Sequence, residues 1–284
     1  MSEWIGEKNY RLGFSILLKL KPSEKPIIKP ANFFKSIIIG NTEPLGKVLV
    51  FEENGGTTLQ ITEKWDFYSE MLVHVAMCSH PNPRRVLIIG GGDGGTAREV
   101  LKHKEVREVT IVEIDEKVVE ACKEFLKIDK GALSHEKTRI VIKDGLEYLG
   151  EYEGEPYDII LGDWTDPYLN TPAEKLITER FFNAAKKALQ KDGILAVQSG
   201  SPIFQPEVVK RAYRAVKKVF NNVYLYLAPI PFYPGGLWSF IVASDKIDPR
   251  TPLREIKETV YYTREIHLSS FALPYFIKKM LEEQ

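Results

Sequence analysis

The chain has 284 residues, and its formal net charge is zero because 39 Lys and Arg balance 39 Asp and Glu. This neutral balance argues against nucleic acid or an anionic membrane as the main partner. A hydrophobic content of 44% predicts a substantial core, whereas no apolar run approaches the roughly 20 residues of a membrane helix. Two cysteines and a polar N-terminus without an apolar signal core lead us to expect a cytoplasmic protein without a disulfide framework.

The first sixty residues are typical of short strands. Apolar or β-branched runs at 13–20, 35–40, 46–52 and 57–62 are separated by Pro, Gly and Asn. The ENGG stretch at 53–56 is a turn signal between the last two runs. We therefore predict a small antiparallel β domain over residues 1–64.

Strands and helices alternate in the rest of the chain. A helix is expected from 65 to about 78, because Phe67, Met71 and Val75 recur every four residues. Near-continuous apolar runs follow, and they suit parallel strands covered on both faces. The runs lie at 85–90, 108–114, 138–144, 157–163 and 193–199. Helical stretches at 116–126 and 174–189 lie between them. This order predicts a Rossmann-like, doubly wound parallel sheet, forming a catalytic domain over residues 65–284.

Ligands of such sheets bind at the carboxyl ends of the strands, so the residue after each strand is informative. The first strand ends in a G-x-G-x-x-G loop, which is a weak signal by itself. Acids follow four successive strands, and this pattern is much more specific. The candidate residues for a bound adenosine compound at these strand ends are Gly90, Gly92, Asp93, Glu113, Asp144 and Gly145.

Two of these acids suit an adenosine. Glu113 ends the second strand, where a carboxylate can accept both ribose hydroxyl hydrogens. Asp144 can accept a hydrogen bond from the adenine amino group. The alternatives are a solvated strand-end acid for Glu113 and a turn residue before Gly145 for Asp144.

Asp93 separates two classes of ligand. A carboxylate about 4 Å from a pyrophosphate would repel each charge by roughly 4 kcal/mol at an effective dielectric constant near 20. The same carboxylate attracts a sulfonium compound that carries a free ammonium group. Ordinary S-adenosylmethionine has a carboxylate beside that ammonium, so Asp93 favours the decarboxylated form. The alternative is that Asp93 faces solvent or caps the following helix.

Asp163 and Asp166 lie three residues apart after the fourth strand of the alternating region. Paired acids at the mouth of a cleft can hold a cationic substrate and accept its proton. Aromatic rings also suit ammonium groups and methylene chains; the candidates are Tyr68, Phe232, Tyr233 and Trp238. The alternatives are a capping turn for the two acids and plain core packing for the rings. His267 is expected to be a packed histidine, and the spacing of Cys78 and His80 does not suit a metal.

These residues stand in blocks that resemble the polyamine aminopropyltransferases, the spermidine synthase family. The likeness runs from about Val48 to the C-terminus, and GGGDGG followed by D-x-x-D-P is its most specific part. The blocks are CSHPNPRRVLIIGGGDGGTAREVLKH, VEIDEKVVEACKEFL, KDGLEYL, YDIILGDWTDP, PIPFYPGG and HLSSFALP.

The resemblance implies a β-stranded N-terminal domain, a Rossmann-like catalytic domain, and a homodimer or homotetramer. It implies transfer of the aminopropyl group of decarboxylated S-adenosylmethionine, the co-substrate, to a small amine, with release of methylthioadenosine. No prosthetic group and no metal are expected. By this resemblance, Asp93 is expected to contact the aminopropyl end of the donor, Glu113 its ribose and Asp144 its adenine. Asp163 is expected to accept the proton, and Asp166 to help seat the acceptor amine. Tyr68 and Tyr233 match the two active-site tyrosines of the family.

The chain departs from the family pattern at several positions. Ser69 follows Tyr68 in place of His or Gln, and Lys35 stands for an early glutamine that contacts the donor. Gln60 is the candidate for a second glutamine, after a longer turn. Trp164 replaces a smaller residue, and the loop Tyr168–Ala173 is lengthened. We expect these changes, with Gln60 and Trp164, to shape the acceptor end.

The acceptor stays open among putrescine, agmatine, spermidine and longer amines. Three other functions also stay open. They are a small-molecule N-methyltransferase, a nicotinamide dehydrogenase, which Asp93 opposes, and a non-catalytic polyamine-binding subunit.

Overall fold

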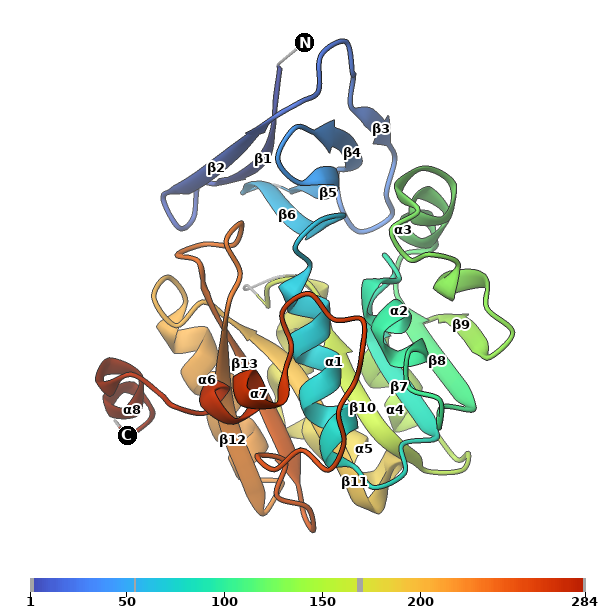
Figure 1. Ribbon diagram of the computed structural model, residues 1–284, viewed down its shortest axis with the longest axis vertical. Helices are drawn as coiled ribbons and strands as arrows, with labels where there is room; N and C mark the ends of the chain where they lie inside the picture. Colours follow the sequence, from blue (N-terminus) through green and yellow to red (C-terminus); the bar gives the residue numbers. More distant parts are fainter. Residues whose placement is uncertain (1–2, 54, 168–170, 283–284) are drawn as a thin grey trace.

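The computed structural model describes residues 3–53, 55–167 and 171–282. Two sheets lie one above the other, as Figure 1 shows. The N-terminal sheet is small and antiparallel, and the larger sheet below it is flanked by helices. None of the helices in the described part of the chain has the length and apolarity that a membrane crossing requires.

The N-terminal sheet has the order β2-β1-β6-β5-β4-β3. Its strands are β1 (Trp4–Asn9), β2 (Phe14–Lys19), β3 (Ile27–Lys29), β4 (Ser36–Thr42), β5 (Gly46–Glu53) and β6 (Gly56–Thr62). The sequence predicted four of these strands and missed β1 and β3. β1 buries two polar residues, Glu7 and Asn9. Its sequence therefore lacks the alternation of apolar and polar residues that predicts a strand.

The larger sheet has the order β12-β13-β11-β10-β7-β8-β9. Its strands are β7 (Arg85–Gly90), β8 (Glu108–Glu113), β9 (Thr138–Ile142), β10 (Tyr157–Asp163), β11 (Leu189–Gly200), β12 (Asn222–Pro229) and β13 (Leu237–Ser244). The expected Rossmann-like class is confirmed, but the expectation of a parallel sheet is wrong for β13. This strand runs antiparallel to both neighbours, because it follows β12 as a hairpin without a crossover helix.

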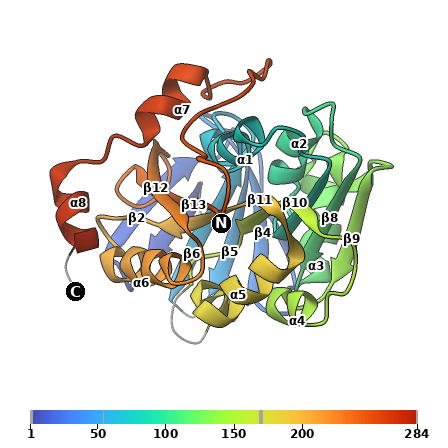
Figure 2. The same ribbon diagram turned by 90° about the horizontal axis from the view of Figure 1, so that it is seen from below.

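Helices cover both faces of this sheet (Figure 2). On one face lie α1 (Phe67–Ser79) and α2 (Gly95–Leu101), and on the other α4 (Gly145–Gly150), α5 (Glu179–Ala188) and α6 (Pro206–Lys217). The remaining helices are α3 (Glu116–Ala121), α7 (Arg264–Ser270) and α8 (Tyr275–Glu282).

The central strands supply both hydrophobic cores. Val86 and Ile88 of β7 join the core beneath α1, whereas Leu87 and Ile89 join the core beneath α5. This two-sided burial explains the continuous apolar runs. β9 differs from the expectation of full cover, since Ile142 is 44% exposed at the edge of the sheet.

The two sheets are joined by polar contacts that hold the N-terminal sheet over the larger one. Lys47 of β5 donates to the carbonyl oxygens of Phe125 and Leu126, the last two residues of the π-helical segment Cys122–Leu126 that follows α3. The N-terminal sheet ends at Thr62 and α1 begins at Phe67. The division into domains at residue 64 stays a prediction.

Candidate active site

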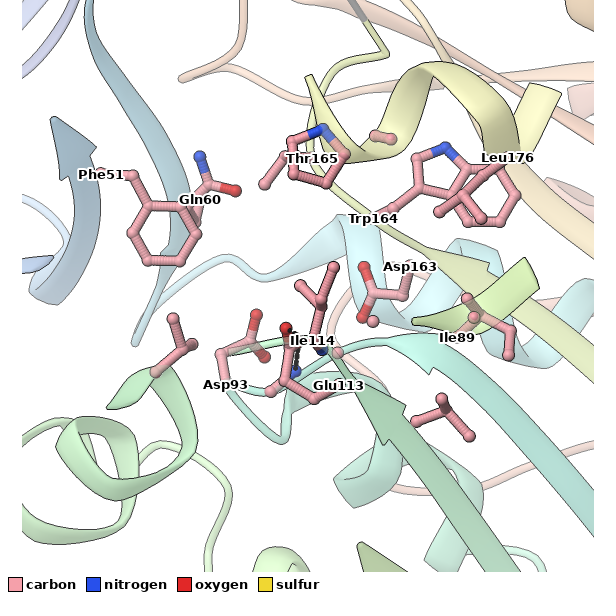
Figure 3. A pocket seen from close by; sticks show the side chains of 18 of the residues that line it. Phe51, Gln60, Ile89, Asp93, Glu113, Ile114, Asp163, Trp164, Thr165 and Leu176 are labelled. Atoms are coloured by element: carbon pink, nitrogen blue, oxygen red, sulfur yellow. Dashed lines mark hydrogen bonds between the residues drawn. The ribbon is translucent and has the colours of Figure 1, made fainter. Parts of the chain in front are cut away.

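The main cavity lies where the N-terminal sheet faces the carboxyl ends of the larger sheet. About 880 Å³ of space lies between its lining atoms, part of it open to solvent. Phe34, Phe51 and Gln60 line it from the N-terminal sheet. The four strand-end acids Asp93, Glu113, Asp144 and Asp163 line it from below, and Figure 3 shows three of them from close by.

The glycine loop packs directly against the end of β10. Gly90 has φ +83°, and a Cβ there would lie 2.0 Å from the carbonyl oxygen of Asp163, so only glycine fits. Gly92 donates its N–H to Oε2 of Glu113 at 3.1 Å. Asp93 lines the cavity and accepts the N–H of Gly95, the first residue of α2, at 2.7 Å; the N-cap of this helix is Gly94. Burial and the nearby charge of Asp163 raise the pKa of Asp93 well above its ordinary value.

Glu113 is 8% exposed and is held by the backbone of its own loop. Its Oε1 accepts the N–H groups of Ile114 and Asp115 at 2.8 and 3.0 Å. Burial raises the pKa of Glu113 to about 7, although these backbone donors work in the opposite direction. These three backbone donors, Gly92 included, fix the orientation of the carboxylate.

Asp144 has two structural partners. Its Oδ1 caps α4 by accepting the N–H groups of Leu146 and Glu147 at 3.0 and 3.1 Å. Its Oδ2 pairs with Nζ of Lys175 at 2.6 Å. The alternative for Asp144 was a turn residue before Gly145; the structure makes it the N-cap of α4, and the residue still lines the cavity beside Gly145.

Asp163 receives a hydroxyl donor on each oxygen. Tyr68 donates to Oδ1 at 2.9 Å, and Thr96 donates to Oδ2 at 2.6 Å. Burial raises the pKa of Asp163 to about 6, the two donors lower it, and the charge of Asp66 raises it further. The sequence analysis missed Thr96, although its place just after the glycine loop was the signal that could have identified it.

A second, smaller cavity of about 360 Å³ adjoins the first. Gln60, Tyr68, Trp164 and Tyr233 line both. Asp166 lines only the smaller one, where its Oδ2 accepts Nε2 of Gln205 at 2.9 Å.

Two polar residues that the sequence analysis missed also line the smaller cavity. Glu7 is 2% exposed, and burial, followed by the charge of Asp166, raises its pKa to about 7. Gln198 donates Nε2 to the carbonyl of Trp164 at 3.0 Å, while its Oε1 is buried without a partner among the described residues. No local pattern marked either residue, since Glu7 lies in a polar run and Gln198 in an apolar strand.

The aromatic residues divide between the cavities and the core. The rings of Tyr68 and Tyr233 meet edge to face at 5.6 Å, and Tyr233 lies 4.7 Å from Trp238. The Tyr233 hydroxyl donates to the carbonyl of Gln60, which ties this loop to the N-terminal sheet. Phe232 is 2% exposed and packs edge-on against Tyr233, so the core alternative holds for it. His267 is buried between Tyr262 and the carbonyl of Pro249, as expected.

The departures from the family pattern do not gather at one place. Lys35 is 67% exposed, pairs with Glu52 and lines neither the main cavity nor the smaller one, whereas its neighbour Phe34 lines the main cavity. Ser69 borders the main cavity. The Trp164 ring packs edge-on against Phe181 at 5.4 Å, in the core beneath α5, although the residue borders both cavities.

Part of the lengthened loop lies outside the described residues, namely 168–170. Pro172 and Ala173 of the same loop line the main cavity, which holds the strand-end acids, and not the cavity that holds Asp166. The expectation that this loop shapes the acceptor end stays a prediction.

This fold and site together define a transferase of the class I methyltransferase-like type, with an acid inside its glycine loop. The chain belongs to a particular family of that type, because the model of the spermine/spermidine synthase domain matches residues 65–254. A polyamine aminopropyltransferase of Bacillus cytotoxicus is 42% identical over 254 residues, which cover 88% of this chain and 90% of that protein. One from Clostridium tetani is 38% identical, with 91% of each chain covered.

Solved structures agree with this membership. A crystal structure of spermidine synthase from Thermotoga maritima is 37% identical to this chain, with a TM-score of 0.84. A crystal structure of spermidine synthase in complex with the transition state analogue AdoDATO is also 37% identical and gives a TM-score of 0.86. In each case 98% of this chain and 94% of the other are covered.

Proposed function

We propose that the protein transfers the aminopropyl group of decarboxylated S-adenosylmethionine to a small amine and releases methylthioadenosine. The observation that carries this proposal is the convergence of Asp93, Glu113 and Asp163 on one buried cavity. Such a cavity attracts a sulfonium compound with a free ammonium and repels a pyrophosphate or a donor carboxylate. Membership of the spermine/spermidine synthase family supports the same reaction.

Each strand-end acid has a proposed role toward the donor. Glu113 accepts the ribose hydroxyls, Asp144 lies at the adenine end, and Asp93 attracts the ammonium of the aminopropyl group. Gly90 and Gly92 let the loop backbone approach the ligand closely. Gly145 allows tight packing at the adenine end, since a Cβ there would lie 2.4 Å from Ile89.

The reaction is an in-line displacement in which the amine nitrogen bonds to the methylene carbon as the carbon–sulfur bond breaks. The electron pair stays on sulfur, so a neutral thioether leaves. An alkylammonium has a pKa of about 10.4, so the amine must lose a proton before attack. Asp163 receives that proton, and Tyr68 and Thr96 hold its carboxylate in place. Its pKa of about 6, against an ordinary 3.8, lowers the cost of this transfer by about 3 kcal/mol.

The smaller cavity suits the rest of the acceptor. Asp166 and Glu7 supply negative charge there, and Oε1 of Gln198 has no hydrogen-bond partner within the described part of the chain. We propose that this cavity holds the second ammonium of a diamine or polyamine, with the Tyr233 and Trp238 rings against its methylene chain. Gln60 and Trp164 line both cavities.

One experiment tests this function. The protein is incubated with decarboxylated S-adenosylmethionine and, separately, putrescine, agmatine, spermidine or a longer amine, and the products are identified by mass spectrometry. Methylthioadenosine and an amine heavier by one aminopropyl group are expected. Adenosylhomocysteine formed from ordinary S-adenosylmethionine would support a methyltransferase, and binding of amines without any turnover would support a non-catalytic subunit.

The assembly and location of the protein are also proposals. We propose a homodimer or homotetramer in the cytoplasm, from the resemblance set out above. Light scattering of the purified protein tests the assembly, and a monomer at micromolar concentration would contradict it.

A further inference from the structure

Two different helices hold the Asp163 carboxylate. Tyr68 is the second residue of α1, and Thr96 is the second residue of α2. Each donates to one oxygen of Asp163, at 2.9 and 2.6 Å. The carboxylate therefore keeps its place only if the first turns of α1 and α2 keep a fixed separation.

One buried ion pair joins these two first turns. Nη2 of Arg98 lies 2.7 Å from Oδ2 of Asp66, and their side chains are 12% and 5% exposed. Asp66 is the N-cap of α1, two residues before Tyr68, and its Oδ1 accepts the N–H of Ser69 at 3.1 Å. Arg98 is in α2, two residues after Thr96. The pair thus links the bases of both Asp163 donors.

The Arg98 guanidinium is itself held on other sides. Its Nε donates to Glu99 at 2.8 Å, and its Nη1 donates to the carbonyl of Ile128 at 2.9 Å. Glu99 also pairs with Lys102 at 2.6 Å and with the buried ring of His74 at 3.0 Å. A planar fork held in this way has little freedom to turn away from Asp66.

The pair also sets the charge near the reacting groups. Asp66 raises the pKa values of Asp163 and Asp93, because its negative charge lies close to both. Arg98 neutralises that charge from the far side. The other groups that face Asp163 are the hydroxyls of Tyr68 and Thr96, the carboxyl of Asp93, and the ring of Tyr233.

We infer that Asp66 and Arg98 are positioning residues for the aminopropyl transfer: their ion pair holds Tyr68 and Thr96 at the separation that Asp163 requires and balances the charge beside it. This inference rests on the proposed role of Asp163 as proton acceptor. Neither residue lines the cavity that would hold the donor, so both act through other side chains.

The test compares Arg98→Gln and Asp66→Asn by the pH dependence of kcat/KM, with the amine that the wild-type protein uses. Arg98→Gln leaves the charge of Asp66 unbalanced, so the acid limb moves to higher pH by roughly 0.5 to 1 unit. Asp66→Asn removes that charge, so the limb moves to lower pH. Asn keeps an oxygen that can cap α1. Both variants are expected to lose about tenfold or more in kcat, because the donors to Asp163 shift.

Arg85→Gln is the matched control. Arg85 also forms ion pairs, with Glu108 and Glu155, but at the opposite end of β7, and its variant should keep the wild-type acid limb. Arg98→Lys keeps the charge without the fork, so it should lose kcat with little shift in pH.

Each outcome decides one question. Acid limbs that move in opposite directions support the inference, because a general loss of structure would not change sign between the variants. Limbs that both stay at the wild-type position, or that move together, would overturn it. If Arg98→Gln does not fold, the downward shift in Asp66→Asn decides alone. Absence of turnover in the wild-type protein would contradict the proposed function instead.

Discussion

Asn32 binds Asp115 through both its backbone and its side chain. Its N–H donates to Oδ2 at 2.7 Å and its Nδ2 donates to Oδ1 at 3.0 Å, across 83 positions of the chain. Asp115 is fully buried and also accepts the N–H groups of Phe33 and, as the N-cap of α3, Lys117. These bonds fix the segment that leads to Phe34 in the wall of the main cavity, where its ring stacks on Phe51 at 4.2 Å.

We therefore expect Asn32→Ala to weaken donor binding. The variant loses a hydrogen bond to a buried carboxylate, which destabilises the arrangement that places Phe34 in the cavity wall by about 1.5 kcal/mol. Donor affinity should therefore fall by up to roughly tenfold. Calorimetry with methylthioadenosine measures the change. Asn183→Ala is the control, because Asn183 also donates from its side chain, to the Glu179 carbonyl on the exposed surface of α5. Equal affinity in both variants would show that the Asn32–Asp115 contact does not shape the donor site.

Asp163→Asn is expected to abolish most turnover and to leave donor binding intact. The amide cannot take the proton of the amine, and loss of a general base typically costs 10²–10⁴-fold. Release of methylthioadenosine measures turnover, and calorimetry measures donor affinity. The exposed Asp192→Asn variant should behave as wild type. If donor affinity falls as steeply as turnover, Asp163 serves binding and not proton transfer.

Glu7→Gln is expected to have opposite effects on stability and on acceptor use. The pKa of Glu7 in the folded protein is about 7, above its ordinary 4.5, so the folded state holds a proton there that the unfolded state releases. Its contribution is therefore present below pH 4.5 and is lost as pH rises to 7. A neutral Gln avoids that loss, and the ligand-free variant should be more stable at pH 7.5 by about 1 to 3 kcal/mol.

The same variant should have a higher KM for the acceptor amine. Glu7 lies with Asp166 in the smaller cavity, so loss of its charge weakens attraction of the distal ammonium and raises the acceptor KM several-fold. Thermal unfolding at pH 5 and 7.5, with saturation curves for the amine, measures both effects. A lower melting temperature with an unchanged KM would refute the assignment.

Asp93→Asn is expected to reduce discrimination between donors. Burial raises the pKa of Asp93 in the empty site, but the lone ammonium of the decarboxylated form favours the ionised carboxylate when it binds. The carboxylate of ordinary S-adenosylmethionine opposes that ionisation, because the two negative charges repel each other. The amide cannot ionise, so the ratio of the two affinities should fall by roughly tenfold or more. Competition calorimetry with both compounds measures this ratio. Glu105→Gln, an exposed acid variant, should leave it unchanged, and an unchanged ratio in Asp93→Asn would remove Asp93 from donor selection.

The sequence alone was enough to predict the Rossmann-like class and the meeting of four acids. Apolar runs identify the strands, and a polar residue that directly follows such a run lies at the carboxyl edge of a parallel sheet. Asp93, Glu113, Asp144 and Asp163 share a cavity for that reason. The sequence also showed the glycines of the loop. The structure gives the reason for Gly90, because a side chain there would collide with the backbone of Asp163.

Other parts of the site depend on segments that are distant in the chain. Each of these parts joins two elements; they are Thr96, Glu7, the Asp66–Arg98 pair and the Asn32–Asp115 contact. The antiparallel direction of β13 also departs from the local pattern. Local residue types determined where strands and turns form, because backbone geometry and burial act over a few residues. Only the tertiary packing, of the helices on the larger sheet and of the two sheets on each other, decided which distant polar groups meet, because buried polar groups must find their partners across the fold.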